Sequence, residues 1–338
     1  MHLDVNEILE GLEAELGSLP RDLHVKKDSG TYAVISGGKV IKMGEPIVTH
    51  CPLAQAISKY RVVATPEMLS REIERRIEEM GYFSPRRTAY QKKLAIPFGA
   101  SEMIMVAMKK GFLDCAVVVC DGAGSVIATD PCVVQGIGAH MNGILHTTPY
   151  REVVERLEER GSSVPFARDG KIDQVEAAGV ALKMGNRRIA VTVSHIDIAR
   201  LKELRAMEKE AGARITLFAV CLTGITDKEA REINDTCDLV WACASAPVRK
   251  IAGPAALLQL GVVIPVFAVT MRGVEMIGSY SNDPEFLEKM DLPRRKYYVT
   301  SARGDGRGKE SSVGIFGVYI HEADSLPVLS GKEPRPLV

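Results

Sequence analysis

The sequence predicts an α/β fold, a doubly wound and mostly parallel sheet with helices on both faces. From residue 98 onward, short apolar runs alternate with amphipathic helical segments, and a glycine follows most of the helices. The runs are apolar at nearly every position, which is typical of strands buried on both faces. Strands that alternate with helices favour parallel pairing through crossover connections. We therefore expect at least five strands in one sheet.

Local patterns indicate the individual elements of this sheet. We expect strands at residues 114–120, 188–194, 214–221, 238–243 and 262–269, and helices at 101–110, 171–184, 196–211, 226–236 and 247–260. Thr226 and Glu229 have the spacing of a capping box, in which each side chain bonds the backbone N–H of the other residue. Pro265 lies inside the last apolar run. Because proline cannot donate to a strand ladder, it favours an edge position or a bulge there.

The N-terminal part of the chain has a different pattern. A helix is expected over residues 3–16, where leucine and isoleucine recur at three- and four-residue steps. Two β-rich runs follow at 31–36 and 39–43. Gly37 and Gly38 between them predict a hairpin turn, because glycine accepts positive φ without strain. A short run at 47–50 and a helix at 66–80 complete this part.

Changes in composition divide the chain into three predicted regions. These are an N-terminal α+β region at 1–95, an α/β domain at 96–325 and a C-terminal extension at 326–338. The polar and basic stretch 86–97 marks the first boundary. Near the end, β-rich runs at 297–301 and 313–321 predict a hairpin at a sheet edge.

The composition excludes several classes of protein. The chain has 338 residues with 43 basic and 43 acidic side chains, so we expect no long-range attraction for nucleic acid. No apolar run reaches the roughly 18 residues of a membrane helix, and residues 1–17 lack the pattern of a secretory signal. Seven cysteines, an odd number, argue against a disulfide framework. We expect a cytoplasmic protein with free thiols and without a nucleic-acid or membrane partner.

Two glycine clusters are the candidates for contact with a cofactor. Gly122 and Gly124 follow a predicted strand, and Gly136 and Gly138 lie close behind in the sequence. Glycine lets a ligand approach the backbone closely, but it also serves in tight turns, which is the alternative explanation. Neither cluster has the G-x-G-x-x-G spacing of a dinucleotide site, and the chain lacks a G-x-x-x-x-G-K-[ST] motif. It also lacks C-x-x-C, G-x-S-x-G and H-E-x-x-H motifs.

Cysteines collect at the predicted carboxyl ends of the strands, the edge at which open α/β sheets bind ligands. Cys120 and Asp121 end one strand, His195 follows another, and Cys221 and Cys243 end two more. Several thiols and an imidazole at one edge predict a soft metal ion or an iron–sulfur cluster, with Cys120, Cys221 and Cys243 as ligands. Alternatively, Cys120 is a thiolate nucleophile and His195 its base, with Asp121 beside them. Simple packing of buried cysteines is the remaining explanation.

Two more cysteines are candidate metal ligands. Cys51 precedes a predicted helix, whose dipole would stabilise a thiolate, and Cys132 lies in a loop close in sequence to the first strand end. Either could reach the edge of the sheet from outside it. Cys115 begins a strand and Cys237 ends a helix, so we assign both to packing.

Four short motifs resemble the methanogenesis marker protein 8 family. They are His50-Cys51-Pro52-Leu53, residues 120–127 (CDGAGSVI), residues 134–138 (VQGIG) and residues 191–194 (VTVS). The resemblance implies an archaeal cytoplasm and a role linked to methanogenesis, but it transfers no catalytic residue. An anaerobic setting favours oxygen-labile metal or iron–sulfur chemistry. An enzyme or cofactor of methanogenesis is then the expected partner.

A second, local resemblance concerns residues 99–119. This helix and strand are similar to the N-terminal segment of the coenzyme F420-reducing hydrogenase β-subunit family, whose members bind flavin and iron–sulfur clusters. The C-x-x-C-x-x-C loops of that family are absent here.

Three hypotheses about function follow. The first is a protein of cofactor handling or enzyme maturation that binds a metal or uses thiolates. The second is a non-catalytic assembly or small-ligand-binding protein, and the third is a flavin or deazaflavin enzyme. A homodimer is expected from the general frequency of dimers alone.

Overall fold

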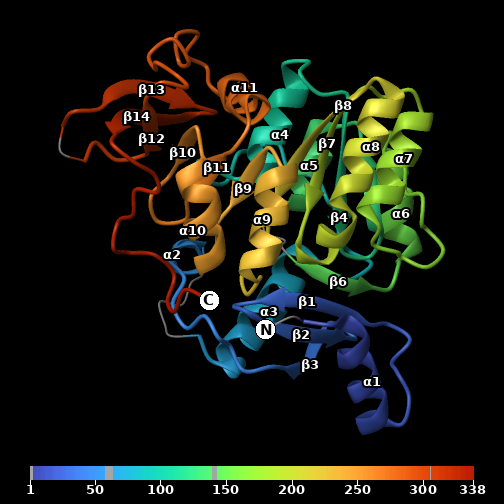
Figure 1. Cartoon of the computed structure of the whole chain (residues 1–338). Coiled ribbons are helices and arrows are strands. Elements are labelled where there is room, and N and C mark those ends of the chain that lie inside the picture. The colour runs from blue at the N-terminus through green and yellow to red at the C-terminus, as the bar shows by residue number, and fades with distance from the viewer. Residues whose placement is uncertain (1–2, 58–63, 139–142, 305) are drawn as a thin grey trace.

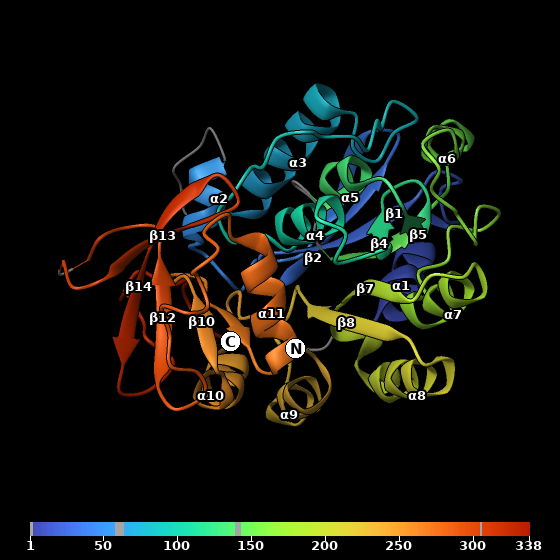
Figure 2. The ribbon, with the colours of Figure 1, turned by 90° about the horizontal axis from the view of Figure 1, so that it is seen from above.

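Two sheets organise the molecule (Figure 1). The computed structural model describes residues 3–57, 64–138, 143–304 and 306–338. A small antiparallel sheet has the strand order β3-β2-β1-β6, and a large mixed sheet has the order β13-β14-β12-β10-β11-β9-β8-β7-β4-β5. Helices cover both faces of the large sheet (Figure 2). The predicted α/β class is therefore confirmed.

The elements have the following bounds. The helices are α1 Val5–Leu16, α2 Pro52–Ile57, α3 Pro66–Met80, α4 Ala100–Lys109, α5 Pro131–Gly138, α6 Arg151–Glu158, α7 Gln174–Lys183, the 3-10 helix His195–Arg200, α8 Leu201–Ala211, α9 Asp227–Thr236, α10 Ala246–Ala255 and α11 Met271–Tyr280. The strands are β1 His24–Asp28, β2 Thr31–Ser36, β3 Lys39–Met43, β4 Cys115–Cys120, β5 Gly124–Ala128, β6 Ile144–Thr147, β7 Arg188–Val193, β8 Arg214–Ala219, β9 Leu239–Trp241, β10 Leu258–Leu260, β11 Val266–Ala268, β12 Lys296–Thr300, β13 Lys309–Val313 and β14 Phe316–Ala323. Within the described ranges, none of these helices has the length and apolar character to cross a bilayer.

The small sheet joins segments that are distant in sequence. Its β2 and β3 form the predicted hairpin, and Gly37 and Gly38 in the turn have φ values of 58° and 74°. The outer strand β6 pairs with β1, which places Thr147 opposite His24. The helix α3 packs its buried Ile77 against this sheet. The small sheet therefore combines three strands from the N-terminal part of the chain with β6, which follows β5 of the large sheet.

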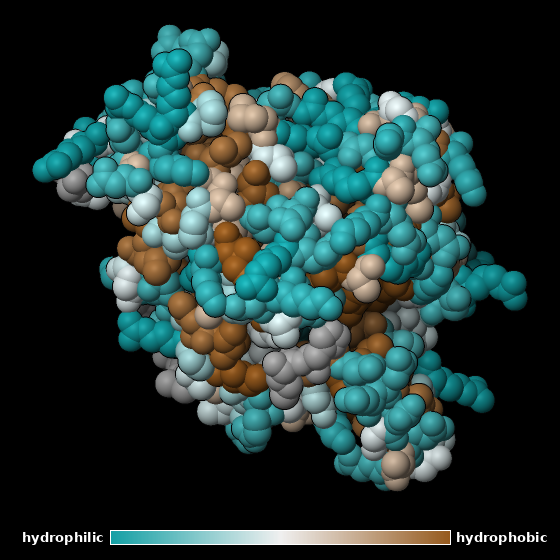
Figure 3. Space-filling model, viewed as in Figure 1, coloured by the Kyte–Doolittle hydropathy of each residue, from teal (hydrophilic) through white to brown (hydrophobic). Residues whose placement is uncertain are grey.

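The large sheet has a core on each face. Its strands β4, β7, β8 and β9 are parallel neighbours in chain order, so each crossover steps in the same direction along the sheet. The apolar sides of α7, α8, α9 and α10 pack on one face, and those of α4, α5 and α11 pack on the other. The surface over α7 and α8 is mostly hydrophilic in Figure 3, as expected for amphipathic helices.

Three expected elements near the sheet differ in the structure. The predicted helix 247–260 ends at Ala255, and its last residues form β10. The predicted strand 262–269 shrinks to β11, which runs antiparallel between β9 and β10. Pro254 and Pro265 account for both differences, because proline ends a helix and cannot donate within a strand. In addition, β5 pairs with β4 as a hairpin where the sequence predicts only a turn.

The C-terminal segment returns to the middle of the molecule. The predicted runs 297–301 and 313–321 correspond to β12 and β14, which pair antiparallel and confirm the expected hairpin, and β13 adds a further strand beyond β14. The predicted strand at 47–50 is reduced to a single bridge between His50 and Arg335. The backbone N–H of Val338 donates to the carbonyl of Ala244, just beyond β9. The end of the chain thus packs against the carboxyl edge of the large sheet.

Candidate functional site

Cys221 and Cys243 lie on neighbouring strand ends. β8 ends two residues before Cys221, and β9 ends two residues before Cys243. The two strands are hydrogen-bonded parallel neighbours. Both cysteines have left-handed backbone, with φ values of 59° and 45°. This conformation is costly for a residue with a Cβ, and such residues cluster at functional sites.

Nearby backbone N–H groups favour the ionised form of both thiols. Those of Leu222 and Cys221 lower the pKa of Cys243, and that of Gly143 lowers the pKa of Cys221. The two side chains also interact electrostatically. N–H groups aimed at sulfur stabilise a thiolate or a metal-bound sulfur more than a neutral thiol. The backbone here is therefore arranged around two sulfur atoms.

Lys27 brings a positive charge to this pair of thiols. It belongs to β1 of the small sheet, is buried, and donates from Nζ to the carbonyl oxygen of Thr223 at 2.5 Å. Its backbone N–H donates to the carbonyl of Gly143 at 2.6 Å. Burial lowers the pKa of Lys27, and the charges of Cys221 and Cys243 act in the opposite direction. The small sheet thus supplies a cation to the edge of the large one.

The protein environment keeps both thiols protonated at neutral pH. Burial raises the pKa of Cys221 to about 12, and the neighbouring Cys243 adds to this increase. Burial likewise raises the pKa of Cys243, although the N–H donors and the Arg249 and Lys27 side chains oppose it. A cation that displaces the thiol protons would leave anionic sulfur next to Lys27. Such an exchange suits soft metal ions, which prefer thiolate ligands.

Cys51 interacts electrostatically with Cys243 from outside the large sheet. The backbone N–H groups of Leu53 and Ala54 at the start of α2 lower the pKa of Cys51. Burial raises its pKa, and Cys243 and Asp28 add to this. We call Cys51, Cys221, Cys243 and Lys27 the thiol site. Among the described residues, no three histidine, cysteine, aspartate or glutamate side chains are grouped closely enough to hold a metal ion.

Cys120 and Asp121 lie apart from the thiol site. They end β4, and β7 stands between β4 and β8, so about 10 Å separates the strands that carry Cys120 and Cys221. The Cys120 thiol is buried and donates to the carbonyl of Asp121 at 3.3 Å. Burial raises the pKa of Cys120. The structure therefore does not place Cys120 beside the other two strand-end cysteines.

Asp121 is the centre of a buried ion pair. Its carboxylate accepts from Arg87 Nε at 2.8 Å and from the backbone N–H of Phe83 at 2.6 Å. The guanidinium also donates to the carbonyl of Gly136 and lies over the Tyr82 ring, 4.3 Å from its centroid. Asp121 thus anchors the 82–87 segment to the end of β4.

His195 and Cys132 occupy different surroundings. His195 is buried in the 3-10 helix that follows β7, where Ser194 and Asp197 form a capping box. Cys132 is half-buried in the first turn of α5, on the opposite face of the sheet from α7, and it interacts with the hydroxyl of Tyr90. The catalytic role of His195 and the metal role of Cys132 remain predictions.

The four candidate glycines are each in close contact with the protein itself. A Cβ on Gly122 would lie 2.7 Å from the Tyr150 ring, and one on Gly124 would lie 2.4 Å from the carbonyl oxygen of residue 170. A Cβ on Gly136 would lie 2.1 Å from the backbone nitrogen of residue 90, and one on Gly138 would lie 2.5 Å from a side chain of α4. Close packing explains these glycines without a cofactor, so their cofactor role stays a prediction.

Sequence reasoning did not identify Lys27 as a site residue. The available signal is the pair Lys26-Lys27 inside a strand whose positions are nearly all buried. Lysine is almost never buried unless it has a partner. The partner lies 196 positions away in sequence, so only the tertiary structure identifies it.

Comparisons with known proteins identify archaeal relatives. A family model described as "Uncharacterized protein conserved in archaea (DUF2099)" matches residues 24–280. A protein of Methanocaldococcus jannaschii, named Uncharacterized protein MJ0054, is 32% identical over 320 residues, which cover 94% of this chain and 100% of that protein. No solved structure matches the chain. The matched range of the family model includes Lys27, Cys221 and Cys243.

Proposed function

The chain belongs to the archaeal DUF2099 family, and we propose that it binds a soft metal ion through Cys221 and Cys243. The observation that carries this proposal is the pair of left-handed cysteines that follow two hydrogen-bonded parallel strands, with the buried Lys27 bonded to the carbonyl oxygen of Thr223 between them in sequence. The role would be to handle a metal or metal-containing cofactor, or to mature an enzyme of methane metabolism in the cytoplasm. The link to methane metabolism rests on the motif resemblance given above.

The charges of the thiol site favour a monovalent soft ion such as Cu(I). Two neutral thiols and one ion react to give a dithiolate complex with a charge of −1, and two protons leave. Lys27 and the buried Arg249 guanidinium both bring positive charge to the pair and favour such an anionic complex. A divalent ion would give a complex without net charge, which these buried cations favour less.

Two other uses of the site are less well supported by its geometry. A nucleophilic cysteine needs a substantial thiolate fraction, but burial raises the pKa of all three thiols. An iron–sulfur cluster needs about four cysteine ligands, and the described cysteines near this edge are three. A two-coordinate soft ion requires only the pair on β8 and β9.

The test is an anaerobic titration with Cu(I) in competition with a chromogenic chelator. We expect one tightly bound Cu(I) per chain and two protons released per ion. C221S and C243S should each weaken binding by about 100-fold or more, because a hydroxyl is a poor ligand for a soft ion. C132S is the matched control, since it removes a half-buried thiol on the other face of the sheet.

Lys27→Met adds a second readout. It should weaken Cu(I) binding at every pH, with two protons still released per ion, because the dithiolate complex then lacks its counter-charge. The proposal is wrong if C221S and C243S bind Cu(I) as tightly as C132S does, or if the folded wild-type protein fails to compete with the chelator.

A further inference from the structure

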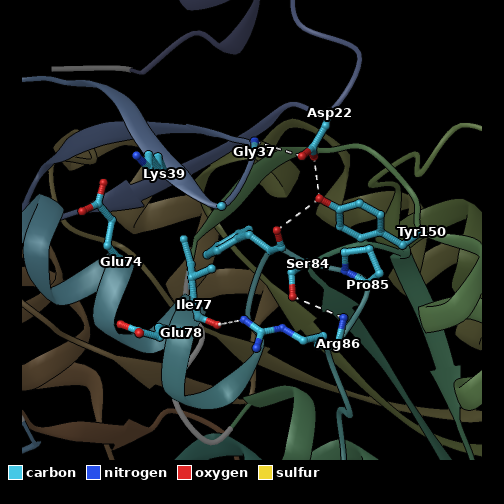
Figure 4. A pocket seen from close by; sticks show the side chains of 12 residues that line it. Asp22, Gly37, Lys39, Glu74, Ile77, Glu78, Ser84, Pro85, Arg86 and Tyr150 are labelled. Atoms are coloured by element: carbon cyan, nitrogen blue, oxygen red, sulfur yellow. Dashed lines mark hydrogen bonds between the residues drawn. The ribbon is translucent and has the colours of Figure 1, made fainter.

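A second candidate site is a pocket between the β2–β3 turn of the small sheet, α3 and the start of α6 (Figure 4). The pocket has a volume of about 590 Å³. Its walls are the β2–β3 turn, α3, the segment 83–86 and the start of α6. No cysteine lines it, so it is separate from the thiol site. Ligand pockets commonly lie where two structural units meet, as the small sheet and the α/β part do here.

One end of the pocket is a hydrogen-bonded chain of four side chains. Asp22 accepts from His24 Nε2 at 2.9 Å, and the hydroxyl of Tyr150 lies 2.9 Å from the same nitrogen. Tyr150 also donates to Asp22, and its hydroxyl lies 3.1 Å from the carbonyl oxygen of Phe83. On the buried side, His24 Nδ1 is 2.7 Å from Thr147 Oγ1. Asp22 and Tyr150 line the pocket, whereas His24 and Thr147 are buried behind them.

The hydrogen-bonded groups follow the order of an Asp–His–hydroxyl triad. Here, however, the aspartate lines the pocket and the threonine hydroxyl is buried. Thr147 would be the nucleophile in such a triad, yet it is only 1% exposed and does not line the pocket. Its oxygen also accepts from the N–H of Gly122 at 2.8 Å. These hydrogen bonds therefore hold Asp22 and Tyr150 in position, and the two side chains present their polar groups to the pocket.

The floor of the pocket is apolar and rigidly held. Ile77 and Phe83 contribute to it, and both are less than 5% exposed. Phe83 has a left-handed backbone with a φ of 49°. Both of its backbone polar groups bond to side chains, the N–H to Asp121 and the carbonyl to Tyr150. An apolar surface with a few fixed polar groups at one end is the usual form of a small-molecule site.

The partly buried charges that line the pocket are negative. The Asp22 side chain is 36% exposed and Glu74 is half-buried, whereas Lys39, Glu78 and Arg86 are exposed. Hydrogen bonds from His24 hold the pKa of Asp22 at about 2, so the carboxylate stays ionised in the physiological range. Exposed rim charges are screened by salt, and a partly buried charge is screened less. The field in the pocket is therefore set mainly by the carboxylates of Asp22 and Glu74.

We infer that this pocket binds a small organic cation, a protonated amine or amidinium with an apolar body. The charged group lies against Asp22 and within reach of Tyr150, and the body lies on Ile77 and Phe83. Charge-assisted hydrogen bonds to a carboxylate are about twice as strong as neutral ones, which makes the cationic end the main source of specificity.

The test uses benzylamine and benzamidine as probes, with benzoate and benzyl alcohol as controls of similar shape. Calorimetry or NMR titration should show binding of both cations and at least about 10-fold weaker binding of the anion and the alcohol. D22N should weaken benzylamine binding by about 10-fold, and Y150F by less. D324N is the matched control, because Asp324 is an exposed carboxylate directly after β14 that does not line the pocket.

A rim variant keeps the test decisive if D22N does not fold. Lys39 is exposed, so Lys39→Glu should fold as the wild type does. It should strengthen benzylamine binding about 2- to 5-fold at low salt, and the gain should vanish at high salt. Tighter binding of benzoate than of benzylamine, or equal benzylamine affinity in folded D22N and D324N, overturns the inference. C221S should bind benzylamine like the wild type, so failure here leaves the thiol proposal unaffected.

Discussion

The buried ion pair between Arg87 and Asp121 offers a quantitative test of the structure. Arg87 is 3% exposed at its side chain and Asp121 is 0% exposed. Asp121 has two close donors, Arg87 Nε at 2.8 Å and the Phe83 N–H at 2.6 Å. Arg87→Met removes the charged partner that the described residues supply and leaves a buried carboxylate with the Phe83 backbone donor. Breaking a buried pair from one side typically costs about 3–5 kcal/mol, because an uncompensated charge remains.

The double variant separates the charge from the rest of the interaction. R87M and D121N alone should each lower the free energy of unfolding by about 3–5 kcal/mol. R87M/D121N removes both charges and keeps an amide oxygen as acceptor for Phe83, so it should lie within about 2 kcal/mol of the wild type. The pair would then show a coupling energy of several kcal/mol.

Urea unfolding at pH 7 measures these values. The chain has one tryptophan, Trp241, which is 7% exposed and should report on unfolding of the large sheet. Circular dichroism should give the same midpoint if the transition is two-state. R151M is the matched control, because Arg151 and Glu155 form an exposed pair that should contribute less than about 0.5 kcal/mol. A loss of under about 1 kcal/mol in R87M, or strictly additive single and double variants, would refute the reasoning.

Two further predictions concern stability. Gly136→Ala should destabilise the protein by more than about 2 kcal/mol, because the added Cβ would lie 2.1 Å from the backbone nitrogen of Tyr90. Gly179→Ala in α7 is the control, since its Cβ would meet nothing closer than 3.9 Å and should stabilise the protein by about 0.5–1 kcal/mol. Thermal and urea unfolding of both variants checks this, and equal effects would contradict it. Burial raises the pKa of Asp197 from 3.8 to about 6, so its contribution to stability is full below pH 3.8 and is lost as the pH rises through 6. The difference between these two pKa values corresponds to about 3 kcal/mol of stability. D197N should therefore make the free energy of unfolding less dependent on pH between 4 and 7. An unchanged pH dependence in D197N would show that Asp197 does not cause it.

The local sequence determined the kinds of element and many of their ends. The Gly37-Gly38 hairpin and the Thr226–Glu229 capping box are present as the patterns predict. Both depend on residues within a few positions of one another, so local backbone preferences and side-chain bonds are sufficient. The apolar runs of the parallel strands were equally clear, since burial on both faces leaves a continuous pattern.

The tertiary structure decided which of these elements meet. The cysteines at the strand ends looked equivalent in the sequence, but β7 separates Cys120 from Cys221, while β8 and β9 are neighbours. Strand order depends on the path of each crossover, which no local pattern encodes. The sequence likewise misjudged the segment 247–269, because the antiparallel insertion of β11 is a pairing choice made by the whole sheet.

The candidate sites show the same division. The sequence by itself supplied Cys221 and Cys243, because they closely follow recognisable strands. Lys27 and the pair Asp22–Tyr150, whose members are 128 positions apart, came only from the packing of the small sheet on the large one. Hydrogen bonds and ion pairs between distant segments form once burial has fixed the elements in place. The chemistry of such sites is therefore a property of the assembled fold and not of any one segment.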